Sequence, residues 1–262
     1  MHAGVGLAAS IAALAFTNIV MLLIVVALDR EFATRDIGDV FDKAAAVLEY
    51  GDRKLRALAV GGSVPDPPAL FADIVTLRVA LATTIAYQLM AVGIVVAVVR
   101  RPVRTLIRDF GLHQYRGRSL WVPAGAAVGC YIMVGAYAFA ADALGIDILI
   151  PESTVPTEIL RDRWTTALTG VTATIGAPIS EELFFRGLIF GGLLRWGFLP
   201  AAGISSLLFA AVHLDIGSLV PFTIIGLTLA WLYWRRGNLW DAIAFHVMFN
   251  AASFILLIST EA

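Results

Sequence analysis

The stretch from Ile74 to Val99, IVTLRVALATTIAYQLMAVGIVVAVV, contains 26 residues, of which only Arg78 is charged. An α-helix rises 1.5 Å per residue, so about 20 apolar residues cross the roughly 30 Å hydrocarbon core of a membrane. This stretch is therefore predicted to be a transmembrane helix.

Six further apolar runs resemble it in length and composition. Together the runs predict an all-α fold, a polytopic transmembrane helical bundle of about seven spans, with boundaries good to a few residues. The six runs cover residues 5–28, 120–141, 165–194, 199–213, 219–234 and 239–258.

The composition also favours a membrane protein and excludes several other classes. Hydrophobic residues make up 59% and charged residues 15% of the 262 residues, whereas soluble domains carry about 45–50% and about 25%. The net charge of −1 offers no basic surface for nucleic acid. The single cysteine, Cys130, allows neither an intrachain disulfide nor a multi-cysteine metal cluster. We expect an integral, multi-pass protein whose partner is the lipid bilayer.

The first 164 residues hold the first three spans and one long polar insertion. The first run is expected to be a retained helix, because residues 1–10 lack Lys and Arg and the run is longer than the core of a signal peptide. The insertion, residues 29–73, has nine acids and six bases. Its apolar residues recur at nearly helical spacing, so it is either an amphipathic helix on the membrane surface or a solvated helical loop.

Arginine-rich short loops predict the orientation. Residues 100–118 contain six arginines and one acid, and Arg195, Arg235 and Arg236 mark the same side of the membrane. Such loops face the cytoplasm. The loop of residues 142–164, with five acids and two arginines, then lies outside, and the N-terminus lies inside.

Two of the seven glutamates, Glu181 and Glu182, lie within a predicted span. A carboxylate at that depth is costly unless it is paired or hydrated, so it marks a candidate functional site. Arg186 follows Glu182 by four residues and shares its helical face, whereas Glu181 points about 100° away. A carboxylate without a counter-ion binds a proton more readily than a paired one, as a general base must. Glu181 is the candidate base, and Glu182 with Arg186 the candidate brace; the alternative is an ion pair that only joins two helices.

Two of the four histidines, His213 and His246, also lie in the last predicted spans. Counted from the arginines at the inner edge, Glu181 and His213 lie roughly 21 Å deep and His246 roughly 15 Å deep. The three side chains are therefore expected to meet in one cavity. The run of residues 165–194 is too long for a straight crossing, so a tilt or a break is expected at residues 176–178.

These residues form three motifs, and with them the sequence resembles the CPBP family of intramembrane endopeptidases, which includes type II CAAX prenyl proteases and bacteriocin-immunity relatives. The resemblance covers about residues 165–259 and makes residues 165–262 the expected catalytic core. The motifs are EExxxR at Glu181, Glu182 and Arg186, FxxxH at Phe209 and His213, and HxxxN at His246 and Asn250.

The resemblance implies hydrolysis of a peptide bond within the membrane. Glu181 would take a proton from a water held by His213, and His246 and Asn250 would donate hydrogen bonds to the oxyanion. Two histidines and a carboxylate also match a catalytic zinc site, with His213, His246 and Glu181 as ligands. Asn250 beside His246 and the absence of HExxH favour the metal-free mechanism.

The expected substrate is a peptide or a membrane-anchored protein, and the expected location is a bacterial cell membrane. The main alternative is a non-catalytic membrane scaffold or immunity protein that binds partner proteins. A proton-coupled transporter is disfavoured, because the intramembrane glutamates and histidines all follow residue 165 and no repeat relates the two halves.

Overall fold

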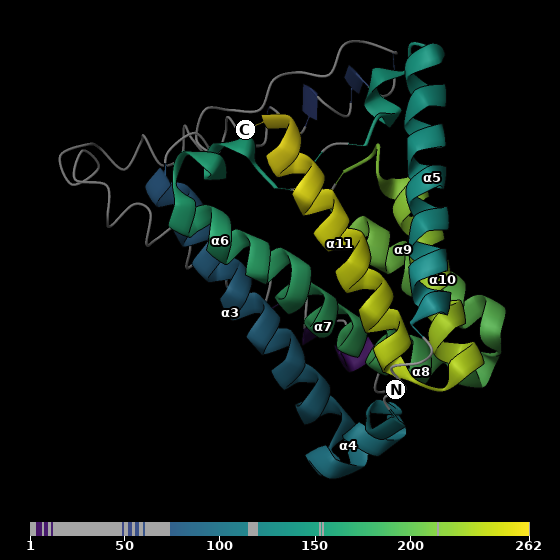
Figure 1. Cartoon of the computed structure of the whole chain (residues 1–262). Helices are drawn as coiled ribbons and strands as arrows, with labels where there is room; N and C mark the ends of the chain where they lie inside the picture. Colours follow the sequence, from purple (N-terminus) through teal and green to yellow (C-terminus); the bar gives the residue numbers. More distant parts are fainter. Residues whose placement is uncertain are drawn as a thin grey trace.

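The computed structural model describes residues 74–114, 120–151, 153, 155–213 and 215–261, together with scattered positions before residue 61. Within these ranges every regular element is a helix, which confirms the all-α prediction (Figure 1). The predicted first span, residues 5–28, and most of the polar insertion, residues 29–73, lie outside the described residues. The number of spans and the side of the N-terminus stay predictions.

Three long helices agree with predicted spans to within three residues. They are α3 (Ile74–Val99), α5 (Trp121–Ala143) and α11 (Leu239–Glu261). Each contains a segment of at least 22 residues that is long and apolar enough to cross a membrane. The chain is therefore an integral membrane protein. The helix α9 (Phe198–Ala211) is apolar but has only 14 residues, and α10 (Leu219–Arg236) has 18.

The run of residues 165–194 is a succession of helical segments. It contains α6 (Arg163–Val171), the π-helical segment η7 (Thr172–Gly176), α7 (Ala177–Glu181), the π-helical segment η8 (Glu182–Phe190) and α8 (Gly191–Leu193). Of the tilt or break expected at residues 176–178, the break is wrong, because Gly176 has helical dihedral angles, φ −63° and ψ −51°, and the tilt stays a prediction. The chain adapts to Pro178 by widening into a π turn.

Short helices connect the longer ones. On the side where the arginines gather, α4 follows α3 and η3 precedes the turn to α5; on the other side, η5 and η6 form the connection from α5 to α6. The short elements are α4 (Val103–Asp109), η3 (Leu112–Gln114), η5 (Asp147–Leu149), η6 (Thr157–Arg161) and η9 (Leu194–Trp196).

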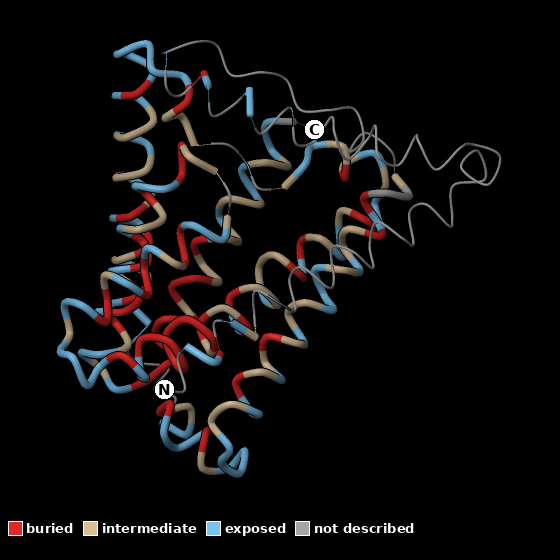
Figure 2. The backbone as a smooth tube through the Cα atoms, turned by 180° about the vertical axis from the view of Figure 1, so that it is seen from behind, coloured by how far each residue is buried: buried red, intermediate tan, exposed pale blue. Residues whose placement is uncertain are grey.

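The helices form a wedge around η8 (Figure 1). The helix α3 runs beside α6 and α7 on one side, α5 lies on the opposite side, and α11 passes between them. Buried residues concentrate near the narrow end of the wedge, where η8 packs against α9 and α10 (Figure 2). In η8 every residue except Leu183 is buried. The most tightly enclosed part of the described structure is thus the segment that carries Glu182 and Arg186.

A polar contact joins α3 to the start of α6. The Asp162 carboxylate caps α6 by accepting a hydrogen bond from the Thr165 backbone N–H at 2.9 Å, and it also accepts one from Arg78 of α3 at 2.9 Å. The hydrogen bonds from Thr165 and then from Arg78 lower the pKa of Asp162 from its ordinary value of 3.8 to about 2. Asp162 itself lies before the predicted span of residues 165–194, and Arg78 lies near the start of the span in α3.

Candidate active site

Glu182, Arg186 and His246 form a fully enclosed polar cluster in the core. The Glu182 and Arg186 side chains are both 0% exposed, and an Arg186 guanidinium N–H donates to Glu182 Oε1 at 3.1 Å. A second Arg186 N–H donates to the Gly226 carbonyl of α10 at 3.2 Å. The pairing agrees with the EExxxR spacing, because residues four apart share a helical face.

His246 of α11 is the third member of this cluster. Its Nδ1 lies 2.9 Å from Glu182 Oε1, the same oxygen that pairs with Arg186. A carboxylate engaged with arginine accepts hydrogen bonds, so His246 Nδ1 is the donor. This bond fixes the orientation of the imidazole and leaves Nε2 on its other side.

Glu181 lies beside this cluster but in a different environment. Its side chain is 26% exposed, and its Oε2 is 3.9 Å from His246 Nε2, too far for a direct hydrogen bond. Among the described residues no donor reaches that oxygen. The two adjacent glutamates therefore differ as the sequence indicates, with Glu182 enclosed and paired and Glu181 facing open space.

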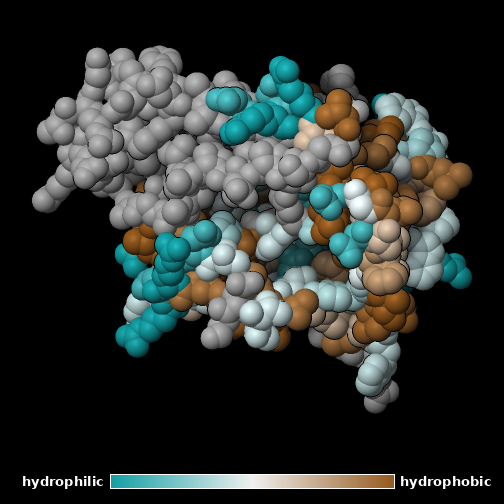
Figure 3. Space-filling model, turned by 90° about the horizontal axis from the view of Figure 1, so that it is seen from above, coloured by the Kyte–Doolittle hydropathy of each residue, from teal (hydrophilic) through white to brown (hydrophobic). Residues whose placement is uncertain are grey.

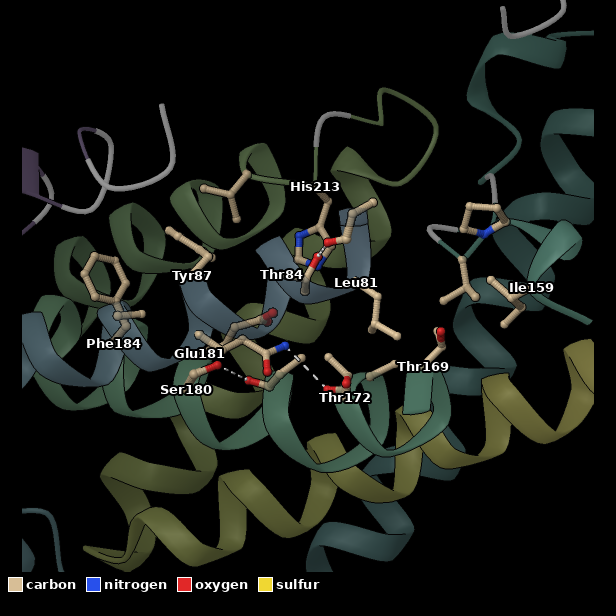
Figure 4. A pocket seen from close by; sticks show the side chains of 18 of the residues that line it. Leu81, Thr84, Tyr87, Ile159, Thr169, Thr172, Ser180, Glu181, Phe184 and His213 are labelled. Carbon is tan, nitrogen blue, oxygen red and sulfur yellow. Dashed lines mark hydrogen bonds between the residues drawn. The ribbon is translucent and has the colours of Figure 1, made fainter. Parts of the chain in front are cut away.

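That open space is a cavity of about 410 Å³ between α3, η6 and the helix that carries Glu181. In the close view, Phe184 and Ile159 mark its two ends, and Glu181 and His213 both point into it (Figure 4). Seen from above, the molecular surface is hollowed near its centre, with hydrophilic residues in the hollow (Figure 3). The cavity thus offers a mostly apolar channel with one carboxylate on its wall.

His213 lies two residues beyond the end of α9. Its Nδ1 is 2.7 Å from the carbonyl oxygen of Phe209, which can only accept, so Nδ1 donates and Nε2 is left toward the cavity. The Phe209 ring meets both imidazoles edge-on, at centroid distances of 5.0 Å to His213 and 5.7 Å to His246. Glu181 and His213 therefore line one cavity, whereas His246 is not among its lining residues and reaches Glu181 and the Phe209 ring from the enclosed cluster.

Asn250 has a different partner. Its Nδ2 donates to the backbone carbonyl of Ala173, in the π-helical segment η7, at 2.9 Å. From the sequence this amide is expected to be an oxyanion donor. In the structure it contacts the helix that carries Glu181.

The helix α3 contributes to the cavity, which was not predicted from the sequence. Thr84, Tyr87 and Gln88 line its wall opposite Glu181, and Gln88 Nε2 also lies 3.4 Å from the Thr172 carbonyl. The signal was present, because polar residues at positions i, i+3 and i+4 define one face of a helix that is otherwise apolar. That face is the one the structure turns toward Glu181.

A zinc ion would need three protein ligands, and the predicted set was His213, His246 and Glu181. In the described part of the chain no three histidine, cysteine or acidic side chains lie close enough together to hold a metal. In this arrangement the predicted set does not fit a zinc site, and no step is assigned to a metal.

Part of the chain is similar to a known protein family. Residues 163–252 match the model of the "Type II CAAX prenyl endopeptidase Rce1-like" family. We refer to these residues as the Rce1-like segment. The resemblance indicated by the three motifs is thereby confirmed for the stretch that contains all six predicted site residues, which is about a third of the chain.

Two curated bacterial relatives are similar to the Rce1-like segment. "Putative membrane peptidase YdiL" of Bacillus subtilis (strain 168) is 38% identical over 92 residues, which cover 35% of this chain and 37% of that protein. "UPF0177 protein YxdF" of Lactococcus lactis subsp. lactis (strain IL1403) is 38% identical over 88 residues, 32% of this chain and 48% of that protein. The similarity thus spans less than half of each relative. No solved structure matches the chain significantly.

Proposed function

We propose that this protein is an intramembrane endopeptidase in which Glu181 activates the attacking water. The observation that carries the proposal is the contrast between two adjacent carboxylates, one enclosed with arginine and histidine and the other facing a cavity. The match of residues 163–252 to an endopeptidase family supports the same reaction.

The first step is activation of water. The Glu181 carboxylate, which lines the cavity, takes a proton from a water there, and the oxygen of that water attacks the carbonyl carbon of a peptide bond. His213 Nε2 orients this water, because its Nδ1 is already engaged by the Phe209 carbonyl. Glu181 then returns the proton to the departing amide nitrogen, so that a free carboxylate and a free amine result.

The second requirement is a donor for the oxyanion. We assign this contact to His246, whose Nε2 lies 3.9 Å from Glu181 Oε2. His246 Nδ1 donates to Glu182, so Nε2 can donate only when the imidazole carries both protons. That form is positively charged and also donates a hydrogen bond to the oxyanion. A single such donor is typically worth about 2.7–4 kcal/mol.

The cavity also indicates the form of the substrate. It follows α3 from Leu77 to Ala91, which corresponds to about 21 Å at 1.5 Å per residue. A volume of about 410 Å³ spread over that length suits an extended apolar chain, whereas an α-helix is about 10–12 Å across. We propose a peptide or membrane-anchored protein that binds in an extended conformation.

The test is a comparison of membrane proteomes. Cells that produce the wild-type protein and cells that produce Glu181→Gln are compared for membrane peptides that differ in length. Asp142→Asn, an exposed acid at the end of α5, is the matched control. We expect fragments in the wild type and the control that are missing with Glu181→Gln. Partner proteins co-purified equally with all three, with no fragment in any, would instead support the scaffold alternative.

A further inference from the structure

The π turn η7 leaves one backbone carbonyl without a donor from its own helix. In a π turn the N–H of residue i+5 donates to the carbonyl of residue i, and the Ala177 N–H accordingly donates to Thr172. The next carbonyl, that of Ala173, would pair with Ala177 in α-helical spacing or with Pro178 in π spacing. The first N–H is already used, and proline has none.

Asn250 supplies the missing donor. Its Nδ2 donates to the Ala173 carbonyl at 2.9 Å, from a neighbouring helix, α11. A backbone carbonyl left without a donor in an apolar helix is destabilising, so this contact favours the π turn over alternatives that lack it. An amide at this position can therefore hold η7 in its widened form.

Gln88 supports the same turn from the opposite side. Its Nε2 lies 3.4 Å from the Thr172 carbonyl, and a Cβ at Gly176 would overlap its side chain. Glycine at 176 therefore makes the space that Gln88 occupies. Two adjacent carbonyls of η7 thus contact carboxamides from two helices, Thr172 with α3 and Ala173 with α11.

The π turn determines which side chain faces the cavity. It inserts one residue into the helix, and one residue corresponds to a rotation of about 100° for everything that follows. Without the insertion, Ser180 would take the angular position of Glu181, and Glu181 would take that of Glu182. The identity of the carboxylate beside the cavity depends on η7.

We propose that Asn250, assisted by Gln88, is a positioning residue that holds the π turn η7 and thereby turns Glu181 into the cavity. Its importance for catalysis rests on the function proposed for Glu181, whereas the geometry can be tested without any cleavage assay.

The test measures which position faces the cavity. Glu181→Cys and Ser180→Cys are made separately in a Cys130→Ala background, and their reaction rates with a small water-soluble methanethiosulfonate are compared. With Asn250 intact, the cysteine at position 181 should react faster, because Glu181 is 26% exposed at its side chain and Ser180 is 3% exposed. Adding Asn250→Leu should lower this ratio of rates or reverse it.

The matched control is Ser253→Ala on the same helix, which removes a hydrogen bond from Tyr131 but leaves η7 untouched. It should leave the ratio of rates unchanged. An unchanged ratio with Asn250→Leu would overturn the proposal.

A double-mutant cycle covers the case in which Asn250→Leu folds poorly. Pro178→Ala restores a backbone N–H that can donate to the Ala173 carbonyl in π spacing, so this carbonyl has a donor without Asn250. The drop in Tm caused by Asn250→Leu should therefore be much smaller in the Pro178→Ala background than in the wild type. Equal drops in the two backgrounds would contradict the role of Asn250 in capping this carbonyl.

Discussion

Glu181 and Glu182 are neighbours in sequence, yet their surroundings give them different chemistry. The spacing of Glu182 and Arg186 is enough to predict their pairing, because it depends only on helix geometry. The recruitment of His246 and of the Gly226 carbonyl to the same cluster depends on tertiary packing of α10 and α11, which no local pattern encodes. The sequence therefore predicts the pair but not the four-part cluster.

Arg186 is expected to be essential for stability. Arg186→Met leaves the Glu182 carboxylate buried without its cation, and breaking a buried pair in this way costs about 3–5 kcal/mol. Unfolding followed in detergent should show a large fall in Tm.

Two comparisons separate this effect from a general loss of packing. Adding Glu182→Gln removes the unpaired charge and should recover part of the Tm. Arg101→Met disrupts an exposed pair with Asp109 and should cost at most about 1 kcal/mol. If the double variant is no more stable than Arg186→Met alone, the unpaired charge is not the cause.

The histidines carry a prediction about metals. We expect purified protein to contain far less than one zinc per chain and to keep its cleavage activity after treatment with a chelator. Elemental analysis of the wild type, His213→Ala and His246→Ala measures this. Stoichiometric zinc in the wild type that disappears in both variants would show that these residues bind a metal.

At the scale of elements, α3 and α11 could be placed closely from apolar length alone, whereas the helix that carries Glu181 could not. Its π turns result from Pro178, from the space at Gly176 and from amides on two other helices. Proline and glycine predict an irregularity at the right place. Whether that irregularity is a break or a π turn depends on Gln88 and Asn250, which lie 75 or more positions from Thr172 and Ala173 in the sequence.

The contact between Asp162 and Arg78 predicts a pH dependence. The pKa of Asp162 is about 2 in the folded protein, below its ordinary value of 3.8. A lowered folded-state pKa stabilises the fold above the unfolded-state value, and this contribution is lost as the pH falls through the folded-state value. The Tm difference between wild type and Asp162→Asn should thus be present above about pH 4 and close toward pH 2.

Asp147→Asn, in the same connection between α5 and α6, is the control for this measurement. It lacks the bonds to Thr165 and Arg78, so its Tm should not diverge from the wild type in this way. A Tm difference for Asp162→Asn that stays constant from pH 5 to pH 2 would contradict the role of the ionised carboxylate.

At the scale of the whole molecule, apolar runs and three motifs predict an all-α membrane protein with its polar residues gathered in one place. His213, which follows α9, lines the same cavity as Glu181, and His246 of α11 lies 3.9 Å from Glu181 on its other side. The far wall of the cavity was not predicted, because it belongs to α3, outside the Rce1-like segment.

The central claim is that Glu181 activates the water that cleaves the substrate. The most direct measurement is the rate at which a membrane substrate, identified by its fragments in the proteome comparison, is cleaved. The substrate is reconstituted in liposomes together with wild-type protein, Glu181→Gln or Asp142→Asn. We expect cleavage by the wild type and by Asp142→Asn. With Glu181→Gln we expect no detectable cleavage, although its Tm is unchanged. Cleavage by Glu181→Gln at the wild-type rate would contradict it.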